Sequence, residues 1–514
     1  MTEDFEPEPV SVPAQPQPVV SQRKKTTFTG DILRLVTGTT AAQVITVLLT
    51  PVLARLFVPA DFGVFNLYVS LITVLGIIAC LRYELAIVLP ESDHEAANLL
   101  AVSLVFAVLT SLLTIPFIVL WGDDFSILLK EPRLNIYLWS LPISVVFGGV
   151  YLALNNWNTR THQFTRLSIA RVVNNSLTSL SQTGAGLAGL RVAGSLIFGN
   201  LFGTVVATLV LIWRIWVDDC RLFIQSINLK TMLEVISRYR KFPMYSIWGG
   251  LLNNLSWQLP SFLLTFYFSS DVNGYYGLGI RTLQLPMSLI GGAIAQAFLP
   301  RASQALKSGN LKAMVTDVYR RLVDYSLFPL LVLALVGRDL FLIVFGTAWG
   351  DSGTYVQILS VWLFFWFISS PMSQLFVVLE KQEQSLRIHI AIFVTRLLSL
   401  MIGGYFHSPI LAIALFSITG VLTYGYLSLI IIAATGVSGR DIWTIIYTRI
   451  LQFLPVGAVL IVLKLLHASI WITSIIAVLV VGAYGVYTIL HDAQIMQTLA
   501  KIPWLKKLGI GSLK

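Results

Sequence analysis

From residue 32 to residue 490, the chain alternates long apolar runs with short polar breaks. The runs approach the ~20 residues that a helix needs to cross the hydrocarbon core of a bilayer. This pattern predicts an all-α polytopic membrane protein with about fourteen spanning helices. The expected spans are 32–54, 64–81, 97–121, 136–155, 167–190, 192–213, 243–268, 275–299, 322–345, 354–379, 387–406, 409–434, 450–466 and 470–490.

The grouping of these runs predicts two six-helix bundles followed by a further helix pair. The expected parts are a disordered cytoplasmic tail (1–30), an N-terminal bundle (31–213), a cytoplasmic linker (214–242), a C-terminal bundle (243–435), the additional helix pair (436–490) and a basic cytoplasmic tail (491–514). In the linker, Met232, Leu233 and Ile236 are spaced among basic residues. That spacing fits an interfacial helix or a solvated connector equally well.

Composition supports the membrane assignment, because 56% of the residues are apolar and only 12% are charged. The charged share is about half of that in a soluble globular protein. The formal charge of +10 would suggest nucleic acid as a partner of a soluble chain. Here 25 of the 35 Lys and Arg fall on the side of the N-terminus and four fall opposite. This asymmetry predicts that both termini are cytoplasmic, and we expect no nucleic-acid partner.

Sequence signatures of enzyme chemistry are missing. The chain has no HExxH motif, Walker A loop, dinucleotide-binding turn or nucleophile elbow. Its six His and two Cys, Cys80 and Cys220, match no metal-ligand spacing. The expected outer loops are also too short to form a catalytic domain. We therefore expect a protein that is not an enzyme and has no metal or cofactor.

Two outer turns share an order of residues. Proline, Asp, Gly and an aromatic residue recur as Pro51, Asp61, Gly63 and Phe65, and as Pro260, Asp271, Gly274 and Tyr276. One explanation is that unrelated turns share the same residue preferences, because Asp and Gly favour turns. We favour an internal repeat that relates the two bundles in the same orientation, since both segments follow an odd-numbered span.

The segment from Gln43 to Pro90 resembles the polysaccharide-export flippases of the multidrug/oligosaccharidyl-lipid/polysaccharide transporter superfamily. The resemblance lies in Thr50-Pro51-Val-Leu-Ala-Arg55-Leu-Phe, Ala60-Asp61-Phe-Gly63 and Leu81-Arg82-Tyr83-Glu84-Leu-Ala-Ile-Val-Leu-Pro90. It implies gating or motif roles for Arg55, Asp61, Gly63, Arg82 and Glu84. On spacing alone, Glu84 would be a solvated loop acid. The fourteen spans also look like the lipid-linked peptidoglycan precursor flippase of that superfamily, in which an added helix pair helps to house the lipid tail.

Arginines inside the expected spans are candidates for a functional role, because placing an Arg at mid-bilayer costs about 2.5–3.5 kcal/mol of insertion free energy. Arg396 lies deepest, about 15 Å from either end of its helix. Arg281 lies nearer an end, where its side chain could snorkel or line a cavity, and Arg34 is expected near an inner end, where its default role is to set topology. Guanidinium groups bind phosphate through two parallel hydrogen bonds. A cavity lined by Arg34, Arg281 and Arg396 would suit a lipid diphosphate.

Amide side chains beside indoles add a second indication of the cargo. Asn253, Asn254 and Gln258 lie between or next to Trp248 and Trp257 in one expected span. Amides and indoles suit sugar hydroxyls and sugar faces. Polar contacts between helices explain the amides equally well.

Taken with the resemblance, these residues predict a flippase that moves a polyprenyl-diphosphate-linked oligosaccharide across a bacterial inner membrane by alternating access. The implied cargo is linked to undecaprenyl diphosphate, and the implied partners are membrane lipids and possible polysaccharide polymerase and chain-length machinery. One alternative is a cation-coupled multidrug antiporter, which would favour buried carboxylates. Asp324 and Asp339, near helix ends, are the main acids within the spans. Another is a membrane-embedded polysaccharide polymerase or ligase, which would need larger outer loops.

Overall fold

The structure, a computed structural model, describes residues 28–491, and within them the side chains of all residues except 28–39, 41–42, 285–297, 299–300 and 489. The expected tails lie outside the described residues except at 28–30 and 491. Within the described range every regular element is a helix, and there is no strand.

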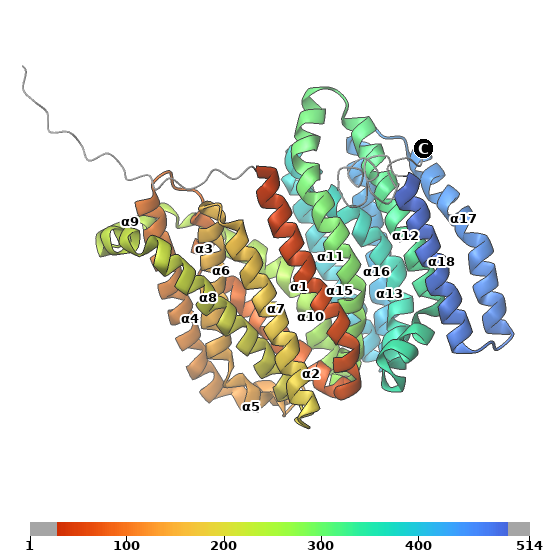
Figure 1. The fold of residues 1–514 in the computed structure, drawn as a ribbon, viewed down its shortest axis with the longest axis horizontal. Coiled ribbons are helices and arrows are strands. Elements are labelled where there is room, and N and C mark those ends of the chain that lie inside the picture. Colours follow the sequence, from red (N-terminus) through yellow and green to blue (C-terminus); the bar gives the residue numbers. More distant parts are fainter. Residues whose placement is uncertain (1–27, 492–514) are drawn as a thin grey trace, which may run out of the picture.

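The first group of helices forms the N-terminal half (Figure 1). Its elements are α1 (Phe28–Leu56), α2 (Pro59–Ala79), α3 (Tyr83–Ala86), α4 (Asp93–Leu128), α5 (Leu134–Leu138), α6 (Leu141–Arg160), α7 (Phe164–Leu187), α8 (Ala193–Ser226) and α9 (Leu229–Arg238). Local sequence explains how several of them begin. Pro59 stands at the start of α2, where a missing N–H costs nothing, and Ser92 caps α4 by accepting a hydrogen bond from the His94 backbone N–H.

The second group forms the C-terminal half, which α17 and α18 flank on its far side (Figure 1). A π-helical turn (Phe242–Ser246) leads into α10 (Ile247–Tyr267), α11 (Ser270–Lys307), α12 (Leu311–Phe345), a 3-10 turn (Thr347–Trp349), α13 (Gly350–Met372), α14 (Leu375–Val378), α15 (Gln382–Tyr405), α16 (Pro409–Ala434), α17 (Gly439–Leu465) and α18 (Ile470–His491). Ser269 caps α11 by accepting a hydrogen bond from the Val272 backbone N–H, 3.3 Å away.

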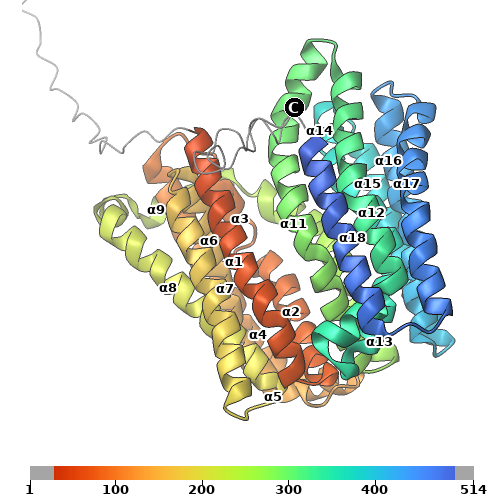
Figure 2. The same cartoon turned by 45° about the vertical axis from the view of Figure 1, so that its right-hand side comes forward.

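The two halves meet along α2, which packs against both α10 and α11. They lie close together at the end that carries α5 and diverge toward the end that carries α9 (Figure 2). The largest apolar core runs through the C-terminal half and continues into α2, while a second core lies inside the N-terminal half.

Nine helices among the described residues are long and apolar enough to cross a membrane: α2, α4, α8, the stretch Thr347–Val378 around α13, α12, and α15 to α18. The chain is therefore a multi-pass membrane protein by length and composition of its helices. The long helices α6, α7, α10 and α11 are less apolar, because they carry amides and arginines. Many of those polar side chains line the chamber described below.

The linker expected at 214–242 contains the last turns of α8 and all of α9. Val235 on α9 is buried, and Met232 and Ile236 pack beside it against the core of the N-terminal half. Leu233 points away and is exposed. The apolar side of α9 is thus held mainly by protein contacts with α4.

The additional helix pair, α17 and α18, packs on α12 through a separate apolar cluster. Phe328 of α12 stacks on Tyr484 of α18, with ring centroids 4.1 Å apart. Two ion pairs also join α12 to α17. Arg449 lies 2.5 Å from Asp324, and Lys464 lies 3.1 Å from Asp339. The two acids within the expected spans therefore hold the pair onto the C-terminal half.

Candidate functional site: a chamber between the halves

Three adjoining pockets lie between and beside α2, α10 and α11. They measure about 410, 400 and 500 Å³. The pocket between the halves shares Asn254 with the pocket on the N-terminal side and shares Trp257 and Gln284 with the pocket on the C-terminal side. Because the same side chains face neighbouring pockets, we treat the three as one chamber with a central, an N-side and a C-side part.

A seam of contacts joins the halves at the α5 end. Asn273 of α11 donates a hydrogen bond from Nδ2 to the Gly63 carbonyl oxygen of α2, at 2.9 Å. Arg55 donates to the Ile343 carbonyl oxygen at 2.9 Å, and Trp349 donates from Nε1 to the Ala54 carbonyl oxygen at 2.6 Å. These bonds, made from both sides to backbone carbonyls, hold this end of the chamber shut.

Two glycines allow the seam to be tight. A Cβ atom at Gly63 would overlap the Ser270 carbonyl, and a Cβ atom at Gly274 would overlap the Pro59 carbonyl. Each glycine thus meets the carbonyl of a residue that lies four positions before the other glycine. Gly63 and Gly274 are also the two glycines of the repeated turn. The contact is reciprocal, as expected where two related segments face each other.

Acidic and basic side chains reinforce the seam. Asp61 is buried, with its carboxylate 3.6 Å from Arg133. Glu131, between α4 and α5, accepts hydrogen bonds from Arg133 and from the Ser270 hydroxyl of the other half. Burial raises the pKa of Glu131, but these two hydrogen bonds and the charge of Arg133 outweigh it and hold the pKa below its usual value. The Glu131 bridge is therefore ionised at neutral pH.

Arg281 of α11 lines the central part of the chamber. Within the described part of the chain, no hydrogen bond or salt bridge joins its guanidinium to another residue. Asn66 and Ser70 of α2 and Gln258 of α10 line the same part, and Ser70 donates a hydrogen bond to Gln258 Oε1 at 2.9 Å. An unpaired guanidinium surrounded by neutral polar groups is suited to bind an anion.

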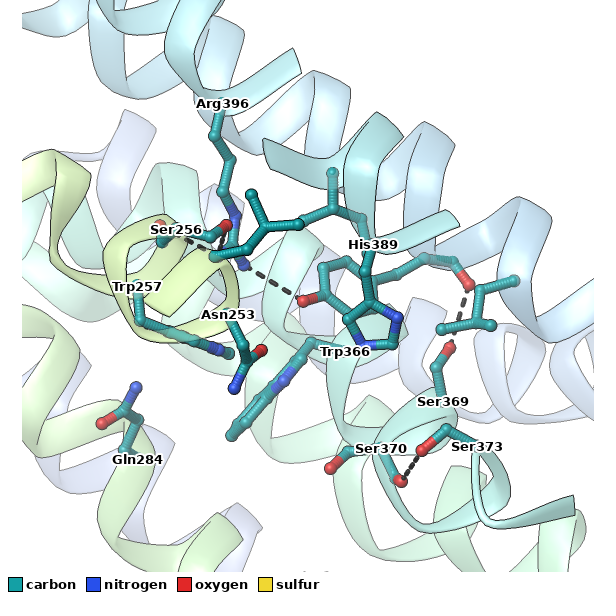
Figure 3. A pocket seen from close by; sticks show the side chains of 14 residues that line it. Asn253, Ser256, Trp257, Gln284, Trp366, Ser369, Ser370, Ser373, His389 and Arg396 are labelled. Atoms are coloured by element: carbon teal, nitrogen blue, oxygen red, sulfur yellow. Dashed lines mark hydrogen bonds between the residues drawn. The ribbon is translucent and has the colours of Figure 1, made fainter. Parts of the chain in front are cut away.

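Arg396 of α15 lines the C-side part but is only 2% exposed. Its Nη1 donates to the Ser256 hydroxyl at 3.1 Å, and its Nη2 donates to the Tyr424 hydroxyl at 3.1 Å (Figure 3). The guanidinium lies 4.5 Å from the Trp257 ring centroid, with three more aromatic rings within 5.8 Å. Cation–π contacts contribute roughly 0.5–2 kcal/mol each. These rings stabilise the buried charge of Arg396, because no acid among the described residues pairs with it.

Arg82 lines the N-side part from the turn between α2 and α3. Its backbone is left-handed, with φ of 66°. The guanidinium lies over Gly250 of α10, where any side chain would collide with it. Arg82 thus reaches from one half to the other at the end of the chamber away from the seam.

Glu84 follows Arg82 and is buried, at 3% exposure, rather than solvated. Its Oε1 lies 3.7 Å from Arg82 Nη1, and its Oε2 has no hydrogen-bond partner among the described residues. Burial raises the pKa of the Glu84 carboxyl, and the nearby Arg82 charge only partly opposes this. The rest of the motif anchors α3, since the Tyr83 hydroxyl donates to the Ile236 carbonyl oxygen at 3.1 Å.

The expected amides all face the chamber. Asn253 lines the C-side part and is exposed to it, Gln258 lines the central part, and Asn254 lines both the central and the N-side parts. Asn254 also donates to the Gly250 carbonyl oxygen at 3.0 Å. The structure therefore brings together Arg281, Arg396, Asn253, Asn254 and Gln258.

The remaining expected site residues divide between two other places. Arg55, Asp61 and Gly63 lie in the seam, while Arg82 and Glu84 lie at the opposite end. Arg34 lies on α1, but its side chain is outside the described residues. Sequence reasoning missed Gln284 and Trp366, which line the chamber. No pattern within their own helices distinguishes them, because the chamber forms only when α10, α11 and α13 pack together.

The charge of the chamber has one sign. Its three parts contain Arg82, Arg281 and Arg396, and no Asp or Glu is among the described residues that line them. Low-dielectric walls strengthen such a potential, because solvent screens it less. The chamber therefore favours a negatively charged ligand.

Comparisons with known proteins agree with this architecture. Residues 52–354, more than half of the chain, match the family described as "Polysaccharide biosynthesis protein". No curated protein sequence matches the chain. Among solved structures, the lipid II flippase MurJ in an inward closed conformation is similar at 13% identity and a TM-score of 0.69, over 88% of this chain and 98% of that one.

Two MATE transporters share the fold less closely. A multidrug resistance MATE family transporter of the MOP superfamily, in an inward-facing conformation, has 14% identity and a TM-score of 0.56, over 80% of this chain and 100% of its own. The Vibrio cholerae MATE transporter VcmN has 14% identity and a TM-score of 0.53, over 80% and 97%. At these identities the likeness is one of fold.

Proposed function

Because the chain belongs to the polysaccharide biosynthesis protein family, we propose that it is a flippase for a polyprenyl-diphosphate-linked oligosaccharide, and that it moves this lipid from the inner to the outer leaflet of a bacterial inner membrane. The observation that supports this cargo is the chamber itself, which contains three arginines and no described acid. A diphosphate would be attracted there, and a drug cation would be repelled.

The proposal extends to topology and transport. About fourteen helices would span the membrane, arranged as two six-helix bundles and a helix pair, with both termini cytoplasmic. The seam is then the outer gate, and the end near Arg82 faces the cytoplasm. The head group would move through the chamber as the halves rock, while its polyprenyl tail stays in lipid. The chamber lowers the barrier because polar groups that lack partners in hydrocarbon cost several kcal/mol each.

The acids weigh against cation antiport. Asp324 and Asp339 pair with Arg449 and Lys464 of α17, on the far side of α12 from the chamber. A drug or proton site built on these carboxylates would require them to leave their partners. The polymerase or ligase alternative finds little support in the chamber, because its described lining is cationic and amide-rich.

Mass spectrometry of lipids that co-purify with the full-length protein tests the cargo. We expect a polyprenyl diphosphate sugar, whose amount falls about tenfold or more in Arg281→Ala, because a charge-assisted bond to phosphate is lost. Arg440→Ala, an exposed site on α17, serves as the matched control. Retention of cationic amphiphiles alone would contradict the proposal.

Glycan analysis after gene deletion separates the flippase from the enzyme. Loss of a flippase leaves single lipid-linked units in the inner leaflet. Loss of a polymerase leaves unpolymerised units outside, and that result would exclude the proposed function.

A further inference from the structure

The C-side part of the chamber differs in chemistry from the central part. Its volume of about 410 Å³ falls within the ~300–1,000 Å³ of small-molecule sites. Two indoles, Trp257 and Trp366, line it together with neutral polar side chains from α10, α11 and α13. The rings meet edge to face, with centroids 5.4 Å apart and an interplanar angle of 69°. Their arrangement offers aromatic surface in two directions.

Three neutral groups on the wall have unused hydrogen-bonding capacity. Asn253, Gln284 and Ser370 line the C-side part, and none has a side-chain hydrogen bond to another described residue. Asn253 and Gln284 lie beside Trp257 and Trp366 in Figure 3. Amides supply both donors and acceptors, which is what sugar hydroxyl groups require. Aromatic faces are electron-rich and match the C–H faces of a pyranose ring.

Arg396 supplies the guanidinium among the described residues of this part, and that group already has partners within the protein. Its bonds to Ser256 and Tyr424 and its contacts with the surrounding rings leave it 2% exposed. By contrast, Arg281 in the central part has no partner among the described residues. An incoming phosphate therefore finds its free donor at Arg281, and the C-side part offers neutral contacts.

The two parts are continuous along α11. Arg281 and Gln284 are three residues apart and so lie on one face of the helix. Gln284 lines both parts, as does Trp257 across from it. A ligand with a charged end at Arg281 and a hydroxylated body pointing toward Trp366 would fill both without crossing a barrier.

We infer that the C-side part is a carbohydrate subsite, in which Trp257, Trp366 and Asn253 hold a sugar of the head group while Arg281 binds its phosphate. This inference rests on the proposed function. It divides the site into a central part that binds the phosphate and a C-side part that recognises the sugar. The subsite is built almost wholly from the C-terminal half. Sugar preference would then be set by α10 and α13.

The test measures binding of two kinds of lipid to the purified full-length protein. The probes are undecaprenyl diphosphate without sugar, and undecaprenyl diphosphate bearing one glucose, galactose or N-acetylglucosamine. We expect at least one sugar-bearing lipid to bind about tenfold or more tightly than the sugar-free lipid. Trp366→Ala should remove that margin, so that the sugar-bearing and the sugar-free lipid bind the variant about equally.

Three further variants keep the result interpretable. Asn253→Leu changes an exposed side chain without removing an indole, and it should reduce the margin even if Trp366→Ala disturbs packing. Trp216→Ala, at an exposed indole on α8, should leave both affinities unchanged. Arg281→Ala should lower the binding affinity for both lipids by a similar factor.

The outcomes separate the two proposals. If neither lipid binds the wild-type protein, the proposed function fails. If the sugar-free lipid binds and no sugar adds affinity, or if the margin survives in Trp366→Ala and Asn253→Leu, the carbohydrate subsite is wrong and the diphosphate site stands.

Discussion

At the scale of single residues, the buried guanidinium of Arg396 is the clearest link between sequence and structure. Its depth in the apolar span indicates a special environment, and the structure supplies one made of four aromatic rings and two hydroxyl groups. A planar guanidinium can stack on rings and hydrogen-bond at its edge at the same time. Lysine has no such plane.

We predict that Arg396→Ala abolishes transport while the protein still inserts and accumulates. The change leaves a cavity beside Trp257 and removes the donor to Tyr424, so the C-side part of the chamber loses its shape. Export of lipid-linked sugar and membrane protein level are the measurements. Arg387→Ala, at an exposed site on the same helix, is the control. Normal export by Arg396→Ala at normal protein level would refute the assignment.

Glu84 gives a prediction about pH. Burial raises its pKa in the folded state, so folding loses stability as pH rises through that raised value and the carboxylate forms. Glu84→Gln has no proton to lose. We expect the variant to melt at a higher temperature than the wild type at pH 8 and at the same temperature below the unfolded pKa of about 4.3. Thermal unfolding in detergent across this range provides the measurement. A higher melting temperature for the wild type than for Glu84→Gln at pH 8 would contradict this prediction. It would show that the ion pair with Arg82 stabilises the Glu84 carboxylate more than burial destabilises it.

At the scale of elements, the seam depends on how closely α2 and α11 approach. Gly63→Ala places a methyl group against the Ser270 carbonyl, and overpacking of this kind costs about 1–3 kcal/mol. We expect the seam to open more often. In a chain whose Cys80 and Cys220 are replaced by Ala, a cysteine at Ser261 in the chamber should react faster with an impermeant thiol reagent added outside.

Gly76→Ala is the matched control for this prediction. Gly76 lies on the same helix, and a Cβ there would meet nothing within 4 Å. Equal labelling rates in Gly63→Ala and Gly76→Ala would mean that the seam is not a gate.

The helix pair gives a second prediction at this scale. Asp324→Asn should lower the melting temperature, because it leaves the half-buried Arg449 without its acid. Asp324→Asn combined with Arg449→Gln should recover most of the loss, since neither charge remains. Transport should continue in the double variant. If it is lost there at normal protein level, Asp324 has a role in coupling and the antiporter alternative regains support.

At the scale of the whole molecule, the proposed alternating access requires the halves to separate at the seam. A Cβ atom at Gly277 of α11 would lie 2.5 Å from Asn66 Cγ of α2. Because Asn66 Cβ is bonded to that Cγ, the Cβ atoms of Asn66→Cys and Gly277→Cys would lie near each other, as a disulfide with its Cβ spacing of about 3.5–4.5 Å requires. In the chain lacking Cys80 and Cys220, we expect oxidation of this pair to stop transport and reduction to restore it. Undiminished transport with the disulfide formed would contradict alternating access.

The sequence by itself determined the helical membrane fold, since a continuous run of ~20 apolar residues satisfies its backbone hydrogen bonds in lipid by forming a helix. It also identified five residues as chamber candidates, because polar groups in apolar spans are costly unless they find partners or line a cavity. These are Arg396, Arg281, Asn253, Asn254 and Gln258. Cargo, span count, orientation and the roles of these residues stay predictions.

Only the tertiary structure decided which side chains share a wall. It paired Asp324 with Arg449, buried Glu84, and set Gly63 and Gly274 against each other's helices. It also placed Gln284 and Trp366 beside Trp257. The physical reason is that helical periodicity reports which face of a helix is polar, while the partner of that face depends on how separate helices pack.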